Sequence, residues 1–126
     1  MDIQRLKNNR KHYEIGVEWA EPKVILSLKE SPEYNLHIWD GYFVAIFGEP
    51  IFADENWVGF TRDYQEGVGA WEKVMEIENI DEYIWDMLRY KDRKFDWEET
   101  PEVFNLIIDF LTYAKQTGQT VIVEAD

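Results

Sequence analysis

Apolar and polar positions alternate along the first half of the chain with the period of a β-strand. The alternation is strict from Tyr13 to Trp19, and it returns from Val24 to Lys29 before Ser31-Pro32 interrupts it. Because successive side chains of a strand point to opposite faces, this pattern predicts two strands, each with one buried face.

A β-hairpin is predicted next. Two runs rich in β-branched and aromatic residues, Tyr34–Trp39 and Tyr42–Phe47, flank the pair Asp40-Gly41. An Asp-Gly pair tolerates the positive φ angles that a type I′ turn requires, so we expect it at the hairpin tip. The second run is apolar throughout and is expected to be a central strand covered on both faces. Trp57–Thr61 is expected to form one more strand.

The second half of the chain changes to helical spacing. The apolar residues of the first predicted helix recur at i, i+3, i+4, i+7 and i+8, namely Ile80, Tyr83, Ile84, Met87 and Leu88. A longer helix is expected from Thr100, as N-cap before Pro101, to a C-cap at Gly118. Thr120–Glu124 then has the composition of a returning strand.

Together these elements predict an α+β fold. It is an antiparallel β-sheet formed by the N-terminal half and a C-terminal strand, with two main helices packed on one face. The length of 126 residues fits a single domain, residues 1–126.

The charge of the chain narrows the range of partners. Twenty-six acidic residues against 13 Lys and Arg give a net charge of −13, whereas residues 1–12 carry a net charge of +3. Aromatic residues make up 16% of the chain, which is typical of a folded protein and not of a disordered acidic tail. A compact body with this field attracts cationic proteins and repels phosphate backbones, so we expect a basic protein partner and no binding to nucleic acid.

The sequence also favours a cytoplasmic location. Cysteine is absent, which excludes disulfides and thiol chemistry. The first twelve residues lack the apolar run of a secretory signal, and the longest apolar runs are too short to cross a bilayer. We therefore expect no membrane partner, while the oligomeric state stays open.

Catalytic and cofactor motifs are not found in the sequence. Two histidines and two serines offer neither a histidine-rich metal site nor a nucleophile elbow, and the seven glycines form no phosphate-binding loop. Carboxylates are abundant, but among 26 some pairs lie close by chance, so they do not indicate an acid and base pair. We expect a non-enzymatic protein without catalytic, cofactor or metal sites.

A binding face is predicted in the late acidic segment. Trp85 lies off the centre of the apolar stripe of its helix, and Trp97 lies among acids, which is the arrangement of an aromatic anchor for a basic partner. The same rings could instead cover the edges of a small core. The predicted face contains Asp81, Glu82, Trp85, Asp86, Asp96, Trp97, Glu98 and Glu99, with Asp81, Trp85 and Asp86 nearer solvent.

In its acidity, its aromatic content and its α+β pattern, the chain resembles the immunity proteins of bacterial toxin systems. These are small, cysteine-poor, often acidic cytosolic proteins that bind and neutralise a toxin domain, frequently a basic nuclease. The resemblance rests on overall character, since no signature aligns residue by residue. It implies an inhibitor of a cognate bacterial toxin.

Other functional classes remain open at this stage. A nucleic-acid mimic would need carboxylates in regular rows along an elongated face. A carbohydrate-binding module would use Trp39, Trp57 or Trp97 as stacking platforms, but a secretion signal would then be expected. A non-catalytic subunit of a larger complex is the remaining alternative.

Overall fold

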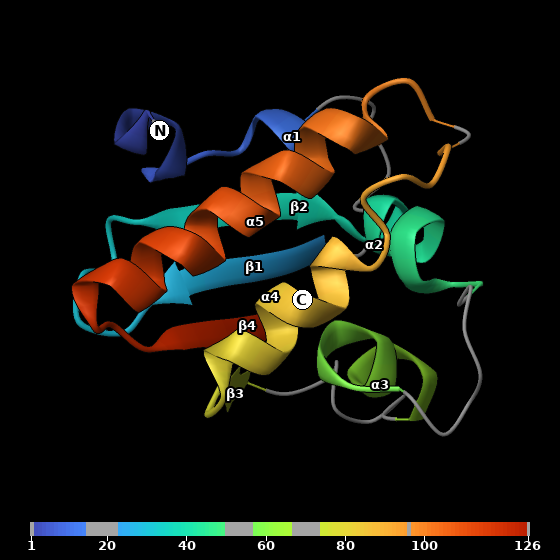
Figure 1. Ribbon diagram of the computed structural model, residues 1–126. Coiled ribbons are helices and arrows are strands. Elements are labelled where there is room, and N and C mark those ends of the chain that lie inside the picture. Colours follow the sequence, from blue (N-terminus) through green and yellow to red (C-terminus); the bar gives the residue numbers. More distant parts are fainter. Residues whose placement is uncertain (1, 15–22, 50–56, 67–73, 96, 126) are drawn as a thin grey trace.

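The structure is a computed structural model of the chain, and it describes residues 2–14, 23–49, 57–66, 74–95 and 97–125 (Figure 1). The elements follow in the order η1 (Ile3–Leu6, a 3₁₀ helix), α1 (Lys11–Glu14), β1 (Lys23–Leu28), β2 (Asn35–Trp39), α2 (Asp40–Phe47), α3 (Gly59–Glu66), β3 (Val74–Glu76), α4 (Ile80–Leu88), α5 (Thr100–Thr117) and β4 (Val121–Ala125).

The four strands form one antiparallel sheet in the order β2-β1-β4-β3. Leu26 at the centre of β1 lies opposite Leu36 of β2 on one side and Val123 of β4 on the other. These three side chains are buried, and burial alternates along β1 and β2 as the sequence pattern predicted. The C-terminal strand is confirmed as an inner strand, because β4 pairs with both β1 and β3.

The helices α4 and α5 lie across one face of this sheet (Figure 1), which confirms the predicted α+β class. Both helices lie where the apolar spacing predicted them. α5 begins one residue after its N-cap Glu99, so Thr100 is its first residue and not the cap. Gly118 ends it in the left-handed conformation, φ +66°, as expected of a C-cap glycine. The buried side of α5 comprises Thr100, Val103, Phe104, Leu106, Ile107, Phe110, Leu111 and Ala114.

The predicted hairpin Tyr34–Phe47 is wrong in its second arm. Asp40 and Gly41 do not form a turn; they begin α2, which directly follows β2. Tyr42, Phe43, Ile46 and Phe47 are buried, whereas Val44 is exposed. Burial at i, i+1, i+4 and i+5 is a helical pattern. The sequence does not show this pattern, because Val44 and Ala45 on the less buried side of the helix are also apolar.

One other predicted strand, Trp57–Thr61, is not found, and another, Tyr13–Trp19, falls mostly outside the described residues. Trp57–Thr61 leads into α3, because Gly59, Phe60 and Thr61 form its first turn. Of the strand predicted at Tyr13–Trp19, Tyr13 lies in α1, and residues 15–22 lie outside the described residues.

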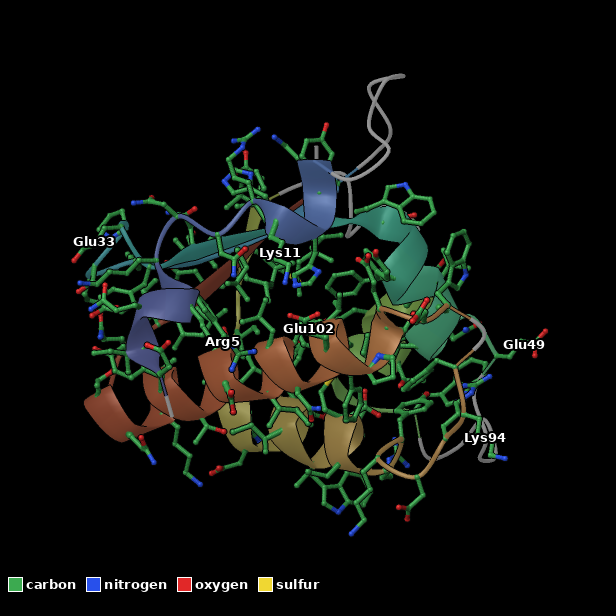
Figure 2. All side chains as sticks on the ribbon, turned by 90° about the horizontal axis from the view of Figure 1, so that it is seen from above. Arg5, Lys11, Glu33, Glu49, Lys94 and Glu102 are labelled. Carbon is green, nitrogen blue, oxygen red and sulfur yellow. The ribbon has the colours of Figure 1, made fainter. Side chains whose placement is uncertain are left out.

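The N-terminal segment lies along the outer edge of β2. The Asn9 amide donates to the carbonyl of Asn35 (2.9 Å), and the His37 amide donates to the carbonyl of Asn9 (2.8 Å). Arg5 and Lys11 reach from this segment to Asp109 (3.3 Å) and Glu102 (3.1 Å) of α5 (Figure 2). As a result, α1 lies over the first turns of α5.

Candidate functional site

A pocket of about 330 Å³ lies between α2 and the segment that joins α4 to α5. Its lining residues are Gly41, Val44 and Ala45 of α2, Glu49 just beyond α2, and Arg93 and Trp97 of the joining segment. The side chains of Val44 and Trp97 are 45% and 50% exposed, so the pocket presents apolar surface to solvent. Such exposed aromatic surface beside a hollow is typical of a binding site.

Packing on Trp39 holds Trp97 in place. The two rings meet edge to face, with centroids 5.1 Å apart, and Trp39 meets Tyr42 in the same way at 5.5 Å. The ring of Trp39 fills the space that a Cβ at Gly41 would take. The carbonyl of Trp97 also accepts from the Thr100 amide (3.1 Å), which joins it to the start of α5. Trp97 is therefore both exposed and fixed in position.

Arg93 and Glu49 supply the charges of the pocket. The Nη1 group of Arg93 donates to the carbonyls of Ile46 (3.2 Å) and Glu49 (2.6 Å), so its positive charge lies at the C-terminus of α2, where the helix dipole favours it. The Glu49 side chain is 93% exposed, and its carboxylate is 4.0 Å from Nη2 of Arg93. Figure 2 shows the Glu49 side chain extending away from the body of the protein. Its carboxylate is thus accessible to a partner.

The predicted site residues of α4 are mostly engaged within the chain. Asp81 forms an ion pair with Lys115 of α5, and Glu82 accepts from Arg62 (3.1 Å). Trp85 is 54% exposed, in agreement with its place off the apolar stripe. The Arg89 guanidinium lies 4.3 Å from the centroid of its ring.

The prediction that Asp86 is near solvent is wrong, because its side chain is fully buried. Its carboxylate accepts from the backbone amide (2.9 Å) and hydroxyl (2.8 Å) of Thr61 and from Arg89 (2.7 Å). The amide of Thr61 is in the first turn of α3, so Asp86 caps that helix from outside. Burial raises the pKa of Asp86, while the bonds from Arg89 and Thr61 act in the opposite direction. Asp86 therefore joins α3 to α4 and does not face a partner.

Trp97, Glu98 and Glu99 directly precede α5. Glu98 is exposed beside Trp97, and Asp96 lies outside the described residues. Glu99 accepts from the Tyr42 hydroxyl (2.9 Å). It lies sixteen residues before Lys115, the partner of Asp81, or about 24 Å along the helix at 1.5 Å per residue. Asp81 and Glu99 therefore lie near opposite ends of α5, so the described residues of the predicted face do not form one compact patch.

A buried histidine beside Glu99 was not anticipated from the sequence. The His12 side chain is 2% exposed, with Nδ1 3.9 Å from Glu99 and Nε2 3.9 Å from Glu102. Its ring also meets the ring of Tyr42 edge on. Burial lowers the pKa of His12 against the effect of the two carboxylates, whereas burial and the bond to Glu99 raise the pKa of Tyr42 to about 12. No local pattern marks His12, because its neighbours come from residues 42 and 99–102.

Within the described ranges, no group of three or more His, Asp or Glu side chains is arranged to hold a metal ion. None of the helices described combines the length and the apolar character that crossing a bilayer requires. Comparisons with protein-family models, curated proteins and solved structures find no match to this chain.

Proposed function

We propose that this chain is a non-enzymatic acidic protein that binds and neutralises a basic protein partner, acting as a cytoplasmic immunity protein against a cognate bacterial toxin. The observation that carries the proposal is the half-exposed Trp97 at the edge of a pocket, with the carboxylates of Glu49 and Glu98 open to solvent around it. An exposed aromatic side chain that is fixed in position beside accessible carboxylates is typical of an interface anchor for a basic partner.

The net charge of −13 supports the same partner class. A negative field steers a cationic protein toward the surface and speeds association, whereas the buried part of the interface sets the dissociation rate. A basic nuclease domain fits this description, because its own nucleic-acid-binding face carries the complementary charge.

The arrangement on α4 favours this function over a nucleic-acid mimic. A mimic needs rows of free carboxylates that stand for phosphates. Asp81, Glu82 and Asp86 are instead paired with Lys115, Arg62 and Arg89. The acids of α4 thus serve largely to join this helix to α5 and α3.

The proposal is tested first by isolating the partner from the cells that produce this chain. A basic protein that co-purifies in stoichiometric amount is expressed alone and together with the chain, and growth of the host is measured. We expect the partner to arrest growth when alone and to be harmless with the chain. A bound partner whose toxicity is unchanged by the chain would contradict the proposed neutralisation.

The kinetics of that complex then locate the interface. Reversing Glu49 and Glu98 to Lys should slow association about ten-fold at low salt and flatten its salt dependence, whereas Trp97→Ala should mainly speed dissociation. Trp85→Ala is the matched control, since Trp85 is equally exposed on α4. A larger effect of Trp85→Ala than of Trp97→Ala on the dissociation rate would indicate that the interface lies on α4. We leave Glu99 unchanged because of its bond to Tyr42.

A further inference from the structure

The two half-exposed tryptophans of the described chain differ in what covers their rings. The guanidinium of Arg89 stacks on Trp85, 4.3 Å from the ring centroid, and also donates to the Asp86 carboxylate (2.7 Å). An indole face together with a carboxylate is thus the environment in which this protein holds one of its own arginines. Such a pair combines a cation–π contact with a charge-assisted hydrogen bond.

The pocket beside α2 offers an indole and a carboxylate again, and Arg93, which also lines it, contacts the carbonyls at the end of α2 and lies near the ring of Tyr90. Trp97 and Glu49 both line it, and among the described residues no cation lies over the Trp97 ring. Val44 and Ala45 complete the wall with apolar surface that suits the hydrocarbon stem of a long side chain. At about 330 Å³ the pocket is near the lower limit of ligand sites, so it suits one side chain better than a larger molecule.

We propose that this pocket receives a single arginine side chain of the basic partner, with its guanidinium between the Trp97 indole and the Glu49 carboxylate. This inference rests on the proposed function and names the group that the site recognises. Arginine is favoured over lysine because a planar guanidinium stacks on an aromatic face and meets a carboxylate in a fork.

Among the described residues that line the pocket, Arg93 is the one cation, and its contacts leave the Glu49 carboxylate accessible. Its Nη1 bonds point to the carbonyls of Ile46 and Glu49, and its guanidinium lies 5.8 Å from the ring centroid of Tyr90. The 4.0 Å separation from the Glu49 carboxylate is too long for a hydrogen bond. An incoming guanidinium therefore does not need to break a short ion pair.

The pocket can be tested without the partner. The ¹⁵N-labelled chain is titrated with the peptide acetyl-Gly-Arg-Gly-amide, and the indole N–H signals of Trp97 and Trp85, assigned with the Phe variants, are followed by NMR. Peptides with citrulline, lysine or glutamate in place of arginine are compared. Citrulline has the shape of arginine without its charge.

We expect a saturable shift of the Trp97 signal with the arginine peptide, with a dissociation constant on the order of 1 mM. Glu49→Gln should weaken binding about five-fold. Glu98→Gln makes the same charge change outside the pocket lining, and it should change the affinity less than two-fold. Circular dichroism confirms that both variants are folded.

Several results would overturn the inference. A Trp97 shift that does not saturate, or that is as large with citrulline, excludes a guanidinium site. Equal binding of lysine reduces the pocket to a general cation site, and preferential binding of glutamate makes it an anion site at Arg93. Equal losses of affinity in Glu49→Gln and Glu98→Gln would indicate that only the overall negative charge of the protein attracts the peptide. If the arginine peptide does not bind while the chain still neutralises its partner, the pocket proposal is wrong and the proposed function stands. If the peptide binds but the chain neutralises no partner, the proposed function is wrong instead.

Discussion

At the scale of single residues, two glycines both have positive φ angles but differ in what an added side chain would contact. Gly59 begins α3 with φ +57°, and a Cβ there would lie 3.1 Å from Cα of Tyr83 and 3.0 Å from Cβ of Asp86. Gly118 has φ +66°, but a Cβ there would meet nothing within 4 Å. Only Gly59 is therefore needed for the close approach of α3 to α4.

Replacing each glycine with alanine should measure this difference. Gly118→Ala should cost about 1 kcal/mol of unfolding free energy, because alanine is strained in the left-handed region. Gly59→Ala should cost about 3 kcal/mol, since the added methyl group must also push α4 away from α3. Urea unfolding followed by circular dichroism gives both values. Equal costs for the two variants would show that α3 and α4 separate without penalty.

At the scale of elements, His12 links α1 to the start of α5. The groups that face it are Glu99, the N-cap of α5, Glu102 of α5, Tyr42 of α2, and the cations Lys11 and Arg5 of the N-terminal segment. Burial is the largest influence and lowers the pKa of His12 below 6.5. The unfolded chain therefore binds more protons than the folded chain in the pH range below 6.5.

This lowered pKa makes stability depend on pH with a definite sign. The contribution of a neutral, buried His12 is complete above pH 6.5 and is lost as pH falls through the folded-state pKa. We expect the unfolding free energy to decrease between about pH 7.5 and pH 5.5, and we expect His12→Gln to remove part of that slope. Urea titrations of both proteins at the two pH values measure it. A parallel pH dependence in the variant would show that other groups cause the slope.

Local pattern was sufficient for some elements and not for others. β1, α4 and α5 were predicted because the spacing of their buried residues is visible in the sequence, and β2 and β4 were predicted because the runs that contain them have the composition of strands. α2 was mistaken for a strand because its less buried side carries the apolar Val44 and Ala45. Six consecutive apolar residues show neither the periodicity of a helix nor that of a strand.

The candidate site depends on that same element. The exposure of Trp85 and Trp97 could be predicted, since Trp85 lies off the apolar stripe of its helix and Trp97 lies among acidic residues. The pocket could not, because it exists only when Val44 and Glu49 belong to a helix and its end. The burial of Asp86 was missed for a related reason, as its partner Thr61 was assigned to a strand. Long-range contacts, and not propensity, decide these features.

At the scale of the whole molecule, two of the four bases of the N-terminal segment form ion pairs with α5. Arg5 and Lys11 pair with Asp109 and Glu102 of α5, and Lys7 lies over the ring of Tyr34. Most of these pairs are at least partly exposed, where an ion pair contributes about 0–1 kcal/mol. Exposed carboxylates such as Glu78, Glu98 and Glu124 add to the net charge of −13.

Salt should therefore act in opposite directions on stability and on partner binding. Raising sodium chloride from about 10 mM to about 150 mM shortens the Debye length from about 30 Å to about 8 Å and screens repulsion among the carboxylates. We expect the melting temperature to rise, and the association rate with the basic partner to fall, over the same range. Reversing Glu78, Glu98 and Glu124 to Lys changes the charge by +2 at each position and brings the net charge from −13 to −7. This variant should show a smaller salt dependence of the melting temperature. A melting temperature that falls with salt in the original chain would mean that its ion pairs outweigh its self-repulsion, and the excess of negative charge would then carry no measurable cost.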